Sequence, residues 1–312
     1  MPPSTSTATS APRSVRPPLF EAVPNFSEGR DGAKISRIVA AARAVEGVRI
    51  LDVHSDPDHN RSVLTFAGEK EPVLEAAVAL AEICAAEIDL TSQTGEHPRM
   101  GSLDVLPFVP LAGATLEEAV RLAQDAGERI GALGLPVYLY EAAASAPHRR
   151  NLADVRRGGC EGLVARIKDP RWQPDYGPSE IEPRKGGVAI GARSFLVAFN
   201  AYLDTDDVEV AKAVAREVRE RDGGLPGVKA LGLKVGGRAQ VSMNLTDLEK
   251  TSIADAVEAV RTLAAGHGAS VESTELVGLA PLNAMLQVVR HYLRLRGLER
   301  EHILEAAFWN EP

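Results

Sequence analysis

The sequence has few of the features that mark membrane and nucleic-acid-binding proteins. No apolar run in its 312 residues approaches the roughly 20 residues that a membrane-spanning helix needs. The formal net charge is −8, and phosphate contacts need a basic surface, so we expect no nucleic-acid partner. An anionic substrate must then be held by a local positive patch rather than by the overall field.

Cysteine and nucleotide-binding motifs are also scarce. Cys84 and Cys160 are the two cysteines, too few for a disulfide framework or a zinc site, so we expect free thiols in a reducing cytoplasm. Neither GxxxxGK[ST] nor GxGxxG occurs in a strand–helix context, which argues against nucleotide binding. Residues 1–18 lack the apolar stretch of a secretory signal and are rich in Pro, Ser and Thr, which predicts a disordered tail.

What the sequence does have is an ordinary globular composition, 45% hydrophobic and 25% charged, with alternating strand and helix patterns. A Gly- and Pro-rich stretch from about Pro170 to Gly191 separates two halves. Each half begins β-α-β-β-α and continues to another strand. The predicted strands are Leu19–Pro24, Val48–Val53, Arg61–Phe66, Leu103–Val109, Val137–Tyr140, Ser194–Leu203, Val228–Val235, Ala239–Leu245 and Ser270–Leu276. The predicted helices are Asp31–Glu46, Glu71–Asp89, Thr115–Leu133, Asp206–Arg221, Ser252–Ala265, Pro281–Arg296 and Glu301–Ala307.

This order of elements is that of the split βαβ unit. It predicts an α/β (α+β) fold with two ferredoxin-like βαββαβ-type subdomains whose sheets face each other. We expect the first subdomain over residues 19–190 and the second over 191–312. A cleft between two such units is a natural place for a flat cofactor.

The segment Gly95–Gly101, with the sequence GEHPRMG, is the first candidate for chemistry. Pro98 biases the backbone of His97 toward an extended conformation, and the flanking glycines allow close approach of a ligand. Asp104 on the next strand could orient the imidazole, which makes His97 a usable general base near neutral pH. A surface loop histidine beside a turn proline is the alternative.

Two other loops are rich in polar residues. In Asp52–Arg61, three acids, two histidines, Asn and Arg fall within ten residues, a pattern open to a metal site, a solvated turn or a substrate-binding loop. In Val23–Arg30, Asn25 and Ser27 can hydrogen-bond a ligand at the start of a helix, and a simple capped turn is the alternative.

Several segments together resemble the formiminotransferase family, in order, from about Phe20 to Leu304. They are VPNFSEGR (23–30), NRSVLTFAG (60–68), GEHPRMGSLDVLPFVPL (95–111), LPVYLYEAAA (135–144), WQPDYGPSE (172–180), GARSFLVAFN (191–200), QVSMNLTD (240–247) and ELVGLAPLNAML (275–286).

The resemblance implies two α/β subdomains with a folate-binding cleft between them. It also implies transfer of a formimino group from N-formimino-L-glutamate to N5 of tetrahydrofolate, a step of histidine degradation and one-carbon metabolism. Vertebrate members carry a fused cyclodeaminase, which we do not expect in a chain that ends at Pro312. The family's habit suggests a homodimer, and we expect no metal.

The resemblance also implies roles for individual residues. The catalytic histidine of the HPRMG motif falls on His97. The folate contacts fall on two stretches, near Gly177–Gly186 and near Gly223–Leu225. Within them the candidates are Gly177, Pro178, Ser179, Arg184, Lys185, Gly186, Gly223, Gly224 and Leu225.

The chain departs from the family in the active-site loop, where vertebrate members have Asp and this chain has His54. Asp52 or Asp56 could substitute for that carboxylate. Arg184 and Lys185 suit the anionic glutamate tail of a folate. Arg61 and Arg99 are candidates for the two carboxylates of formiminoglutamate.

Three other functions are compatible with parts of the sequence. The first is another folate enzyme on the same scaffold, similar to a 5-formyltetrahydrofolate cycloligase. The second is a non-catalytic folate-binding protein, against which the intact HPRMG segment argues. The third is a metal-dependent hydrolase built on the Asp52–Arg61 loop.

Overall fold

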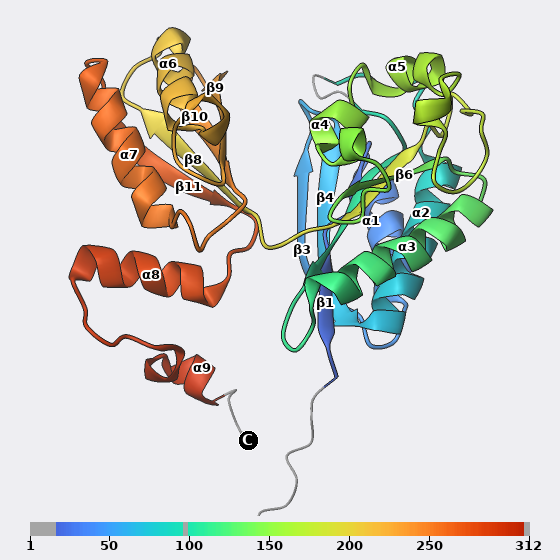
Figure 1. Ribbon diagram of the computed structural model, residues 1–312, viewed down its shortest axis with the longest axis horizontal. Coiled ribbons are helices and arrows are strands. Elements are labelled where there is room, and N and C mark those ends of the chain that lie inside the picture. The colour runs from blue at the N-terminus through green and yellow to red at the C-terminus, as the bar shows by residue number, and fades with distance from the viewer. Residues whose placement is uncertain (1–16, 96–98, 309–312) are drawn as a thin grey trace, which may run out of the picture.

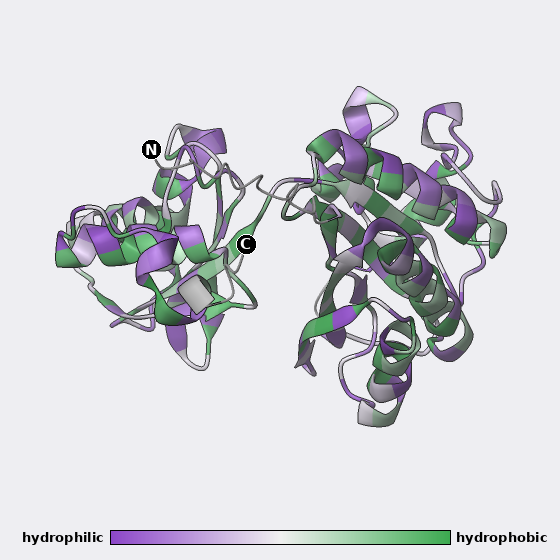
Figure 2. Ribbon diagram, turned by 90° about the horizontal axis from the view of Figure 1, so that it is seen from below, coloured by the Kyte–Doolittle hydropathy of each residue, from purple (hydrophilic) through white to green (hydrophobic). Residues whose placement is uncertain are grey.

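The chain folds into two α/β units joined by a short connection (Figure 1). The structure is a computed structural model that describes residues 17–95 and 99–308, so the tail predicted for residues 1–18 lies almost wholly outside the described residues. We call residues 17–192 the larger subdomain and residues 197–308 the smaller subdomain. Each has its own apolar core, and Figure 2 shows hydrophobic residues gathered separately within the two units.

The larger subdomain is built on a seven-stranded sheet. In it β4 pairs with β3 on one side and with β1 and β2 on the other, and β5 follows, all antiparallel. This is the strand order of a ferredoxin-like unit. Two parallel strands extend it, because β7 pairs with β5 and β6 pairs with β7. The strands are β1 (Leu19–Ala22), β2 (Asn25–Phe26), β3 (Arg49–Asp56), β4 (Arg61–Glu69), β5 (Leu103–Pro110), β6 (Val137–Glu141) and β7 (Val188–Ala192).

Three helices cover one face of this sheet, namely α1 (Gly32–Arg43), α2 (Lys70–Glu87) and α3 (Leu116–Ala132). Asp31 caps α1 by accepting hydrogen bonds from two backbone N–H groups. Thr115 and Glu118 form a capping box at the start of α3. The main core lies between these helices and the sheet, where Phe20, Phe66 and other apolar side chains are fully buried.

The opposite face of the larger sheet is only half covered. The short helices α4 (Leu152–Val155) and α5 (Gly159–Arg166) pack over β5, β6 and β7, where Tyr138 and Tyr140 belong to a second small core. Neighbouring side chains of a strand point to opposite faces, so on β1 and β4 the residues that alternate with the main core point to this second face. We call its uncovered part, over β1, β2, β3 and β4, the open face.

The smaller subdomain repeats the ferredoxin-like unit on its own. Its four strands are antiparallel in the order β11, β8, β10, β9, and a tight turn at Gly236–Gly237 joins β9 to β10. The strands are β8 (Val197–Leu203), β9 (Val228–Val235), β10 (Arg238–Leu245) and β11 (Val271–Val277). The helices are α6 (Val208–Val218), α7 (Ile253–Gly266), α8 (Leu282–Leu293) and α9 (Leu304–Phe308).

The two sheets lie between two outer layers of helices in Figure 1, with α6 and α7 on one side and α1, α2 and α3 on the other. This arrangement confirms the predicted α/β fold with two similar subdomains. Lys229 of β9 lies 3.9 Å from Glu141 of β6, which places an ion pair between the two subdomains. None of the helices in the described part of the chain has both the length and the apolar character needed to cross a bilayer.

One part of the Gly- and Pro-rich stretch was not expected in the sheet. The expectation that residues up to Gly191 only separate the halves is wrong, because β7 is an inner strand of the larger sheet, between β5 and β6. Small residues are required there, since a Cβ on Gly191 would lie 2.6 Å from the ring of Tyr140. Glycine usually lowers strand propensity, so the pattern resembles a linker.

Candidate active site

The open face of the larger sheet carries a cluster of buried polar and charged side chains. Arg61 at the start of β4 donates a hydrogen bond from Nη2 to Asn25 Oδ1 on the neighbouring strand β2. Asp104 on β5 is 1% exposed, and its Oδ2 accepts a bond of 2.5 Å from Arg156 Nη2, just after α4. Three strands and one helix end thus supply two guanidinium groups and one buried carboxylate to the same place.

The electrostatics of this cluster are dominated by loss of water. The pKa of Arg61 is lowered to about 10, mainly by burial; the carboxylate of Asp104 opposes this shift and the positive charge of Arg156 contributes to it. Arg61 therefore remains charged at neutral pH. A desolvated guanidinium interacts more strongly with an anion than one in water does.

Asp52 and His54 lie on β3 and not in a loop, since this strand runs on to Asp56. They pair with Thr65 and Val63 of β4, so their side chains share the open face with Arg61. The predicted strand Val48–Val53 therefore ends three residues too early.

Asp56 shapes the turn that follows. Its Oδ1 accepts hydrogen bonds of 2.9 Å from the backbone N–H groups of Asp58 and His59, and its Oδ2 lies 2.7 Å from His59 Nδ1. The acids and histidines of this segment are thus used partly in a turn and partly on the open face. Among the described residues, no group of three or more His, Cys, Asp or Glu side chains could hold a metal ion.

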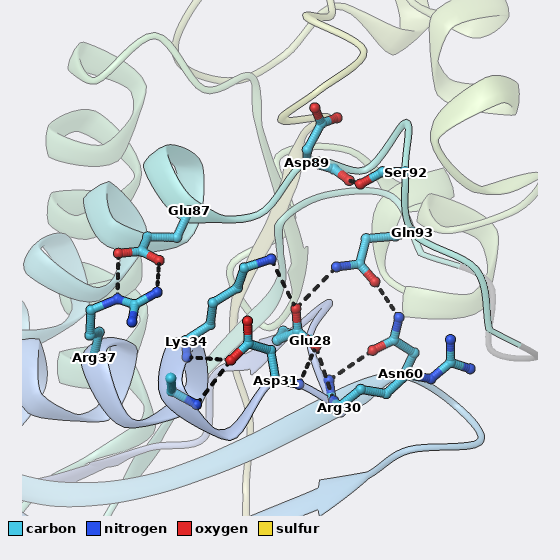
Figure 3. Close-up of polar contacts among 12 residues, drawn as sticks. Glu28, Arg30, Asp31, Lys34, Arg37, Asn60, Glu87, Asp89, Ser92 and Gln93 are labelled. Atoms are coloured by element: carbon cyan, nitrogen blue, oxygen red, sulfur yellow. Dashed lines mark hydrogen bonds and ion pairs between the residues drawn. The ribbon is translucent and has the colours of Figure 1, made fainter.

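His97, the predicted catalytic base, lies in residues 96–98, outside the described residues. The chain just before it is tied down by three buried or half-buried side chains, which we call the Glu28–Gln93–Asn60 network (Figure 3). Asn60 Nδ2 donates to Gln93 Oε1 and to Thr94 O, and Gln93 Nε2 donates to Glu28 Oε2 at 3.2 Å. Gly95 is packed so closely that a Cβ would lie 2.4 Å from the carbonyl oxygen of His59.

Glu28 is the charged member of this network and is 3% exposed. Burial by itself would raise its pKa, but hydrogen bonds from the N–H groups of Asp31 and Arg30, from Gln93 and the charge of Lys34 together lower the pKa below its usual value. The carboxylate is thus ionised and fully engaged at neutral pH. It acts as a fixed acceptor rather than a proton carrier.

The chain after His97 is anchored as well. The carbonyl oxygen of Arg99 accepts a bond of 2.9 Å from Cys160 N–H at the start of α5, and Met100 N–H donates to Asp104 Oδ1 at 2.8 Å. Gly101 forms a bridge with Gly186, and Ser102 N–H donates to the carbonyl oxygen of Lys185. The end of the predicted folate stretch therefore meets the segment that follows His97.

A pocket of about 410 Å³ borders this segment. Its walls come from the chain between α2 and β5, from α5 and from Pro183. They are Leu90, Thr91, Gln93, Gly95, Arg99, Gly158, Gly159, Cys160, Glu161, Val164 and Pro183. Arg99 lines this pocket, whereas Arg61 belongs to the cluster on the open face.

The remaining predicted folate residues fall in three places. Arg184 and Lys185 make surface ion pairs, Arg184 Nε with Asp89 Oδ2 at 2.9 Å and Lys185 Nζ with Glu182 Oε2 at 2.7 Å. Gly177, Pro178 and Ser179 lie beside the end of α3, where a Cβ on Gly177 would lie 2.3 Å from the carbonyl oxygen of Leu135. In the smaller subdomain, Gly223, Gly224 and Leu225 form the turn before β9.

Sequence reasoning missed Arg156 and the Glu28–Gln93–Asn60 network. Sequence analysis assigned no helix or strand to the region of Arg156. The one local feature that could have drawn attention to it is the pair Gly158–Gly159 that follows, and both glycines have a positive φ in the structure. Glu28 and Asn60 lie in two of the segments that resemble the family. Those local patterns do not indicate that the two residues, 32 positions apart in the sequence, belong to one network.

Comparison with known proteins identifies the family to which nearly the whole chain is similar. The family model of the formiminotransferase domain, N-terminal subdomain, matches residues 19–193, and that of the formiminotransferase domain matches residues 198–307. A protein of Thermoplasma acidophilum named glutamate formimidoyltransferase is 46% identical over 92% of this chain and 96% of its own length. A protein of the same name from Streptococcus pyogenes serotype M1 is 42% identical over 92% of this chain and 97% of its own length.

A third relative is longer. The formimidoyltransferase-cyclodeaminase of Mus musculus is 40% identical over 91% of this chain, which corresponds to 54% of that protein. Because two family models together cover nearly all of the described residues, and two relatives match almost from end to end, the chain belongs to the formiminotransferase family.

Proposed function

We propose that this protein is a glutamate formimidoyltransferase. It transfers the formimino group from N-formimino-L-glutamate to N5 of tetrahydrofolate and releases L-glutamate. The observation that carries the proposal is the end-to-end similarity, at 46% and 42% identity, to two proteins that bear this name. The half-buried arginines of the open face, Arg61 and Arg156, support it, because they suit an acidic substrate.

His97 serves as the general base in this proposal. It removes the N5 proton as the tetrahedral adduct forms and returns a proton to the departing glutamate nitrogen. One side chain can do both because the pKa of histidine lies near the operating pH. The larger share of the acceleration comes from holding two substrates together in one orientation.

Asp104 supports His97 through the backbone. Its bond to Met100 N–H fixes the chain two residues after Pro98, in addition to any direct effect of its charge on the imidazole. Arg61 binds one carboxylate of the donor, and Arg99, which lines the 410 Å³ pocket, binds the other. Asn25 holds the guanidinium of Arg61 in place for this task. Asp52 and His54 complete the open face beside them.

Tetrahydrofolate is the co-substrate in this proposal and its glutamate tail is the second anion to be bound. The candidates are the stretch from Gly177 to Gly186 and the turn at Gly223–Leu225, with Arg184 and Lys185 meeting the tail. Arg184 is exposed and Lys185 is half-buried, and both are already in surface ion pairs, so they can exchange partners at little cost. No metal takes part in the proposed reaction.

We propose further that the protein is a cytoplasmic homodimer. Both cysteines are buried free thiols, which suits a reducing compartment. Exposed apolar side chains on α8, among them Leu282, Met285 and Leu293, support contact with a second copy. Light scattering at several protein concentrations should give twice the mass of one chain.

The test of the function is release of L-glutamate from formiminoglutamate with and without tetrahydrofolate. We expect release only when both substrates are present, and unchanged rates after exhaustive chelation. Consumption of 5-formyltetrahydrofolate with ATP, in place of formiminoglutamate, would identify a cycloligase-like enzyme. Binding of folate with no turnover of either donor would identify a binding protein.

A further inference from the structure

The two subdomains have separate apolar cores and are joined by residues 193–196, between β7 and β8. Figure 1 shows this linker crossing from one sheet to the other. The backbone N–H of Arg193 donates to the carbonyl oxygen of Phe108 at 3.1 Å, so the start of the linker is fixed to β5. Ser194, the next residue, is exposed. Two units with their own cores and one short connection are expected to move relative to each other unless further contacts hold them.

Glu141, the last residue of β6, lies directly beside this linker. It pairs with Ala192, the residue that precedes the linker, and the N–H of Ala142 donates to the carbonyl oxygen of Ala192 at 3.1 Å. From the other subdomain, Lys229 Nζ of β9 lies 3.9 Å from Glu141 Oε1. The ion pair therefore connects the two subdomains next to their covalent connection.

The backbone of Glu141 adopts a conformation that residues with a side chain seldom take. Its φ is +53°, in the left-handed region, which places Cβ too close to the following carbonyl oxygen. Apart from glycine, Asn and Asp accept this region most readily, and Glu is not one of them. The N–H of Glu141 donates to the carbonyl oxygen of Arg150 at 3.1 Å, which holds the residue in place. Strain that the surroundings maintain in this way is frequent at functional positions, so it points to a role for the Glu141 side chain.

Lys229 lies on a strand whose other residues on the same face include an exposed apolar strip. Leu231, Leu233 and Val235 form this strip and are 61%, 39% and 41% exposed. They alternate with the residues of β9 that belong to the smaller core, so they share the face of Lys229. Because Lys229 contacts Glu141, this face is turned toward the larger subdomain. The closer the two subdomains lie, the less of this apolar surface water can reach, which favours a closed arrangement.

We propose that Glu141 and Lys229 are positioning residues, whose ion pair holds the two subdomains at the separation that the reaction needs. The proposal rests on the proposed function, which assigns folate contacts to both subdomains. The pair acts through the distance between the two sheets and touches neither substrate. The side chains of Lys229 and Glu141 are 59% and 35% exposed, and such a pair adds little to the stability of a rigid fold. It can still shift an equilibrium between open and closed arrangements, because small differences in free energy decide that equilibrium.

The first test is a double-mutant cycle of Glu141→Gln, Lys229→Gln and the two changes combined. Each single change should raise the KM for tetrahydrofolate by about 2- to 5-fold, the range for an exposed pair. The combined variant should be no worse than either single one, because both changes remove the same interaction. Lys234→Gln is the matched control, since Lys234 lies on the same strand and its ion pair with Asp206, at 3.3 Å, stays within the smaller subdomain.

The reversed pair, Glu141→Lys combined with Lys229→Glu, tests whether charge or shape is responsible. It should return the KM for tetrahydrofolate to within about twofold of the wild-type value, whereas residues with a merely structural role would not be rescued by the exchange. Unchanged KM values in the single variants, additive losses in the cycle, or no recovery on reversal would each overturn the proposal.

A distance measurement between the subdomains needs no turnover, so it separates failure of this inference from failure of the proposed function. Spin labels on Glu82→Cys of α2 and Arg216→Cys of α6 report the separation, since both positions are exposed and both native cysteines are buried. The labelled protein is diluted in unlabelled protein, so that distances within one chain dominate. Glu141→Gln should broaden the distribution of distances, and raised salt should broaden that of the wild type.

The two measurements together give distinct outcomes. If the wild type transfers formimino groups but Glu141→Gln alters neither the distances nor the KM, the inference alone is wrong. If Glu141→Gln broadens the distances but the wild type shows no transfer, only the proposed reaction is wrong.

Discussion

The two subdomains share one strand order but use their charges differently. In the larger subdomain the ion pairs Arg156–Asp104 and Arg149–Asp175 are almost completely buried. In the smaller subdomain pairs such as Lys212–Glu209 are exposed. Its sheet face carries a looser polar group in which Asn200 Nδ2 and the Tyr202 hydroxyl both donate to Glu275 at 3.1 Å.

This difference indicates that the two subdomains have different roles although they share a strand order. Buried charges are costly to place and strongly orienting once in place, so they belong where a reacting group must be held. Exposed polar groups adapt to a partner at little cost. We therefore expect the chemistry to depend on the larger subdomain and the smaller one to contribute contact surface.

The largest effect is expected from His97→Ala. General acid–base catalysis typically contributes about 10²–10⁴-fold, so kcat should fall by that factor with the KM for folate little changed. The matched change in the smaller subdomain is His267→Ala, which removes an exposed contact of 2.7 Å between His267 Nε2 and Glu217 Oε1 and should leave kcat unchanged. Near wild-type turnover of His97→Ala would show that His97 is not the general base. It would also contradict the expectation that the chemistry depends on the larger subdomain.

Asp104→Asn should have the next largest effect, this time on stability. It removes the charge that pairs with Arg156 and acts on Arg61, and breaking a buried pair typically costs about 3–5 kcal/mol. Glu209→Gln in the smaller subdomain breaks an exposed pair, which is worth about 0–1 kcal/mol. Urea unfolding of both variants measures the contrast, and equal losses would mean that burial does not distinguish the two subdomains.

Gln93→Ala tests whether the larger subdomain must hold the chain before His97 in place. The substitution removes hydrogen bonds of that chain but no charged side chain. It removes the link between Glu28 and Asn60, and misplacement of a catalytic group by about 1 Å can cost about 100-fold. We expect kcat to fall by about 10- to 100-fold with both KM values retained. Ser92→Ala, one residue earlier and exposed, is the control. A loss of stability with normal kcat would assign the network a purely structural role.

The smallest effect is expected from Glu28→Gln, measured as the dependence of the unfolding free energy on pH. The pKa of Glu28 is lowered in the folded protein, so its ionisation contributes stability that is present above the unfolded value of 4.5 and is lost as pH falls through the folded pKa. The variant should be less stable at pH 7 and should show a weaker loss on acidification. Parallel pH profiles for the two proteins would contradict this.

The sequence was sufficient to predict most elements of the fold. Strands and helices with a clear period, such as β10 and α7, were found within a few residues, because one face of each is buried against a core. The repeated β-α-β-β-α order then predicted two similar subdomains. The exception is β7, whose residues Val188–Ala192 are buried on both faces and include glycine, so neither alternation nor propensity identifies it.

The candidate site was predictable as a set of residue types but not as a set of contacts. Asn25, Arg61 and Asp104 were selected from separate motifs, and strand pairing brings them onto one face. Their partner Arg156 could not be selected, because α4 has only four residues and gives no periodic signal. The contacts of Asn60 with Gln93 and Thr94 likewise depend on where a turn meets a distant segment, which local patterns do not contain.

The position of β7 has a consequence for how the protein is made. Because β7 lies between β5 and β6, the ribosome must synthesise the chain as far as Ala192 before the larger sheet can close. A nascent chain that ends earlier leaves the parallel edges of β5 and β6 unpaired, and such edges are templates for aggregation. Addition of the last strand of the larger subdomain is therefore the step that removes these two unpaired edges.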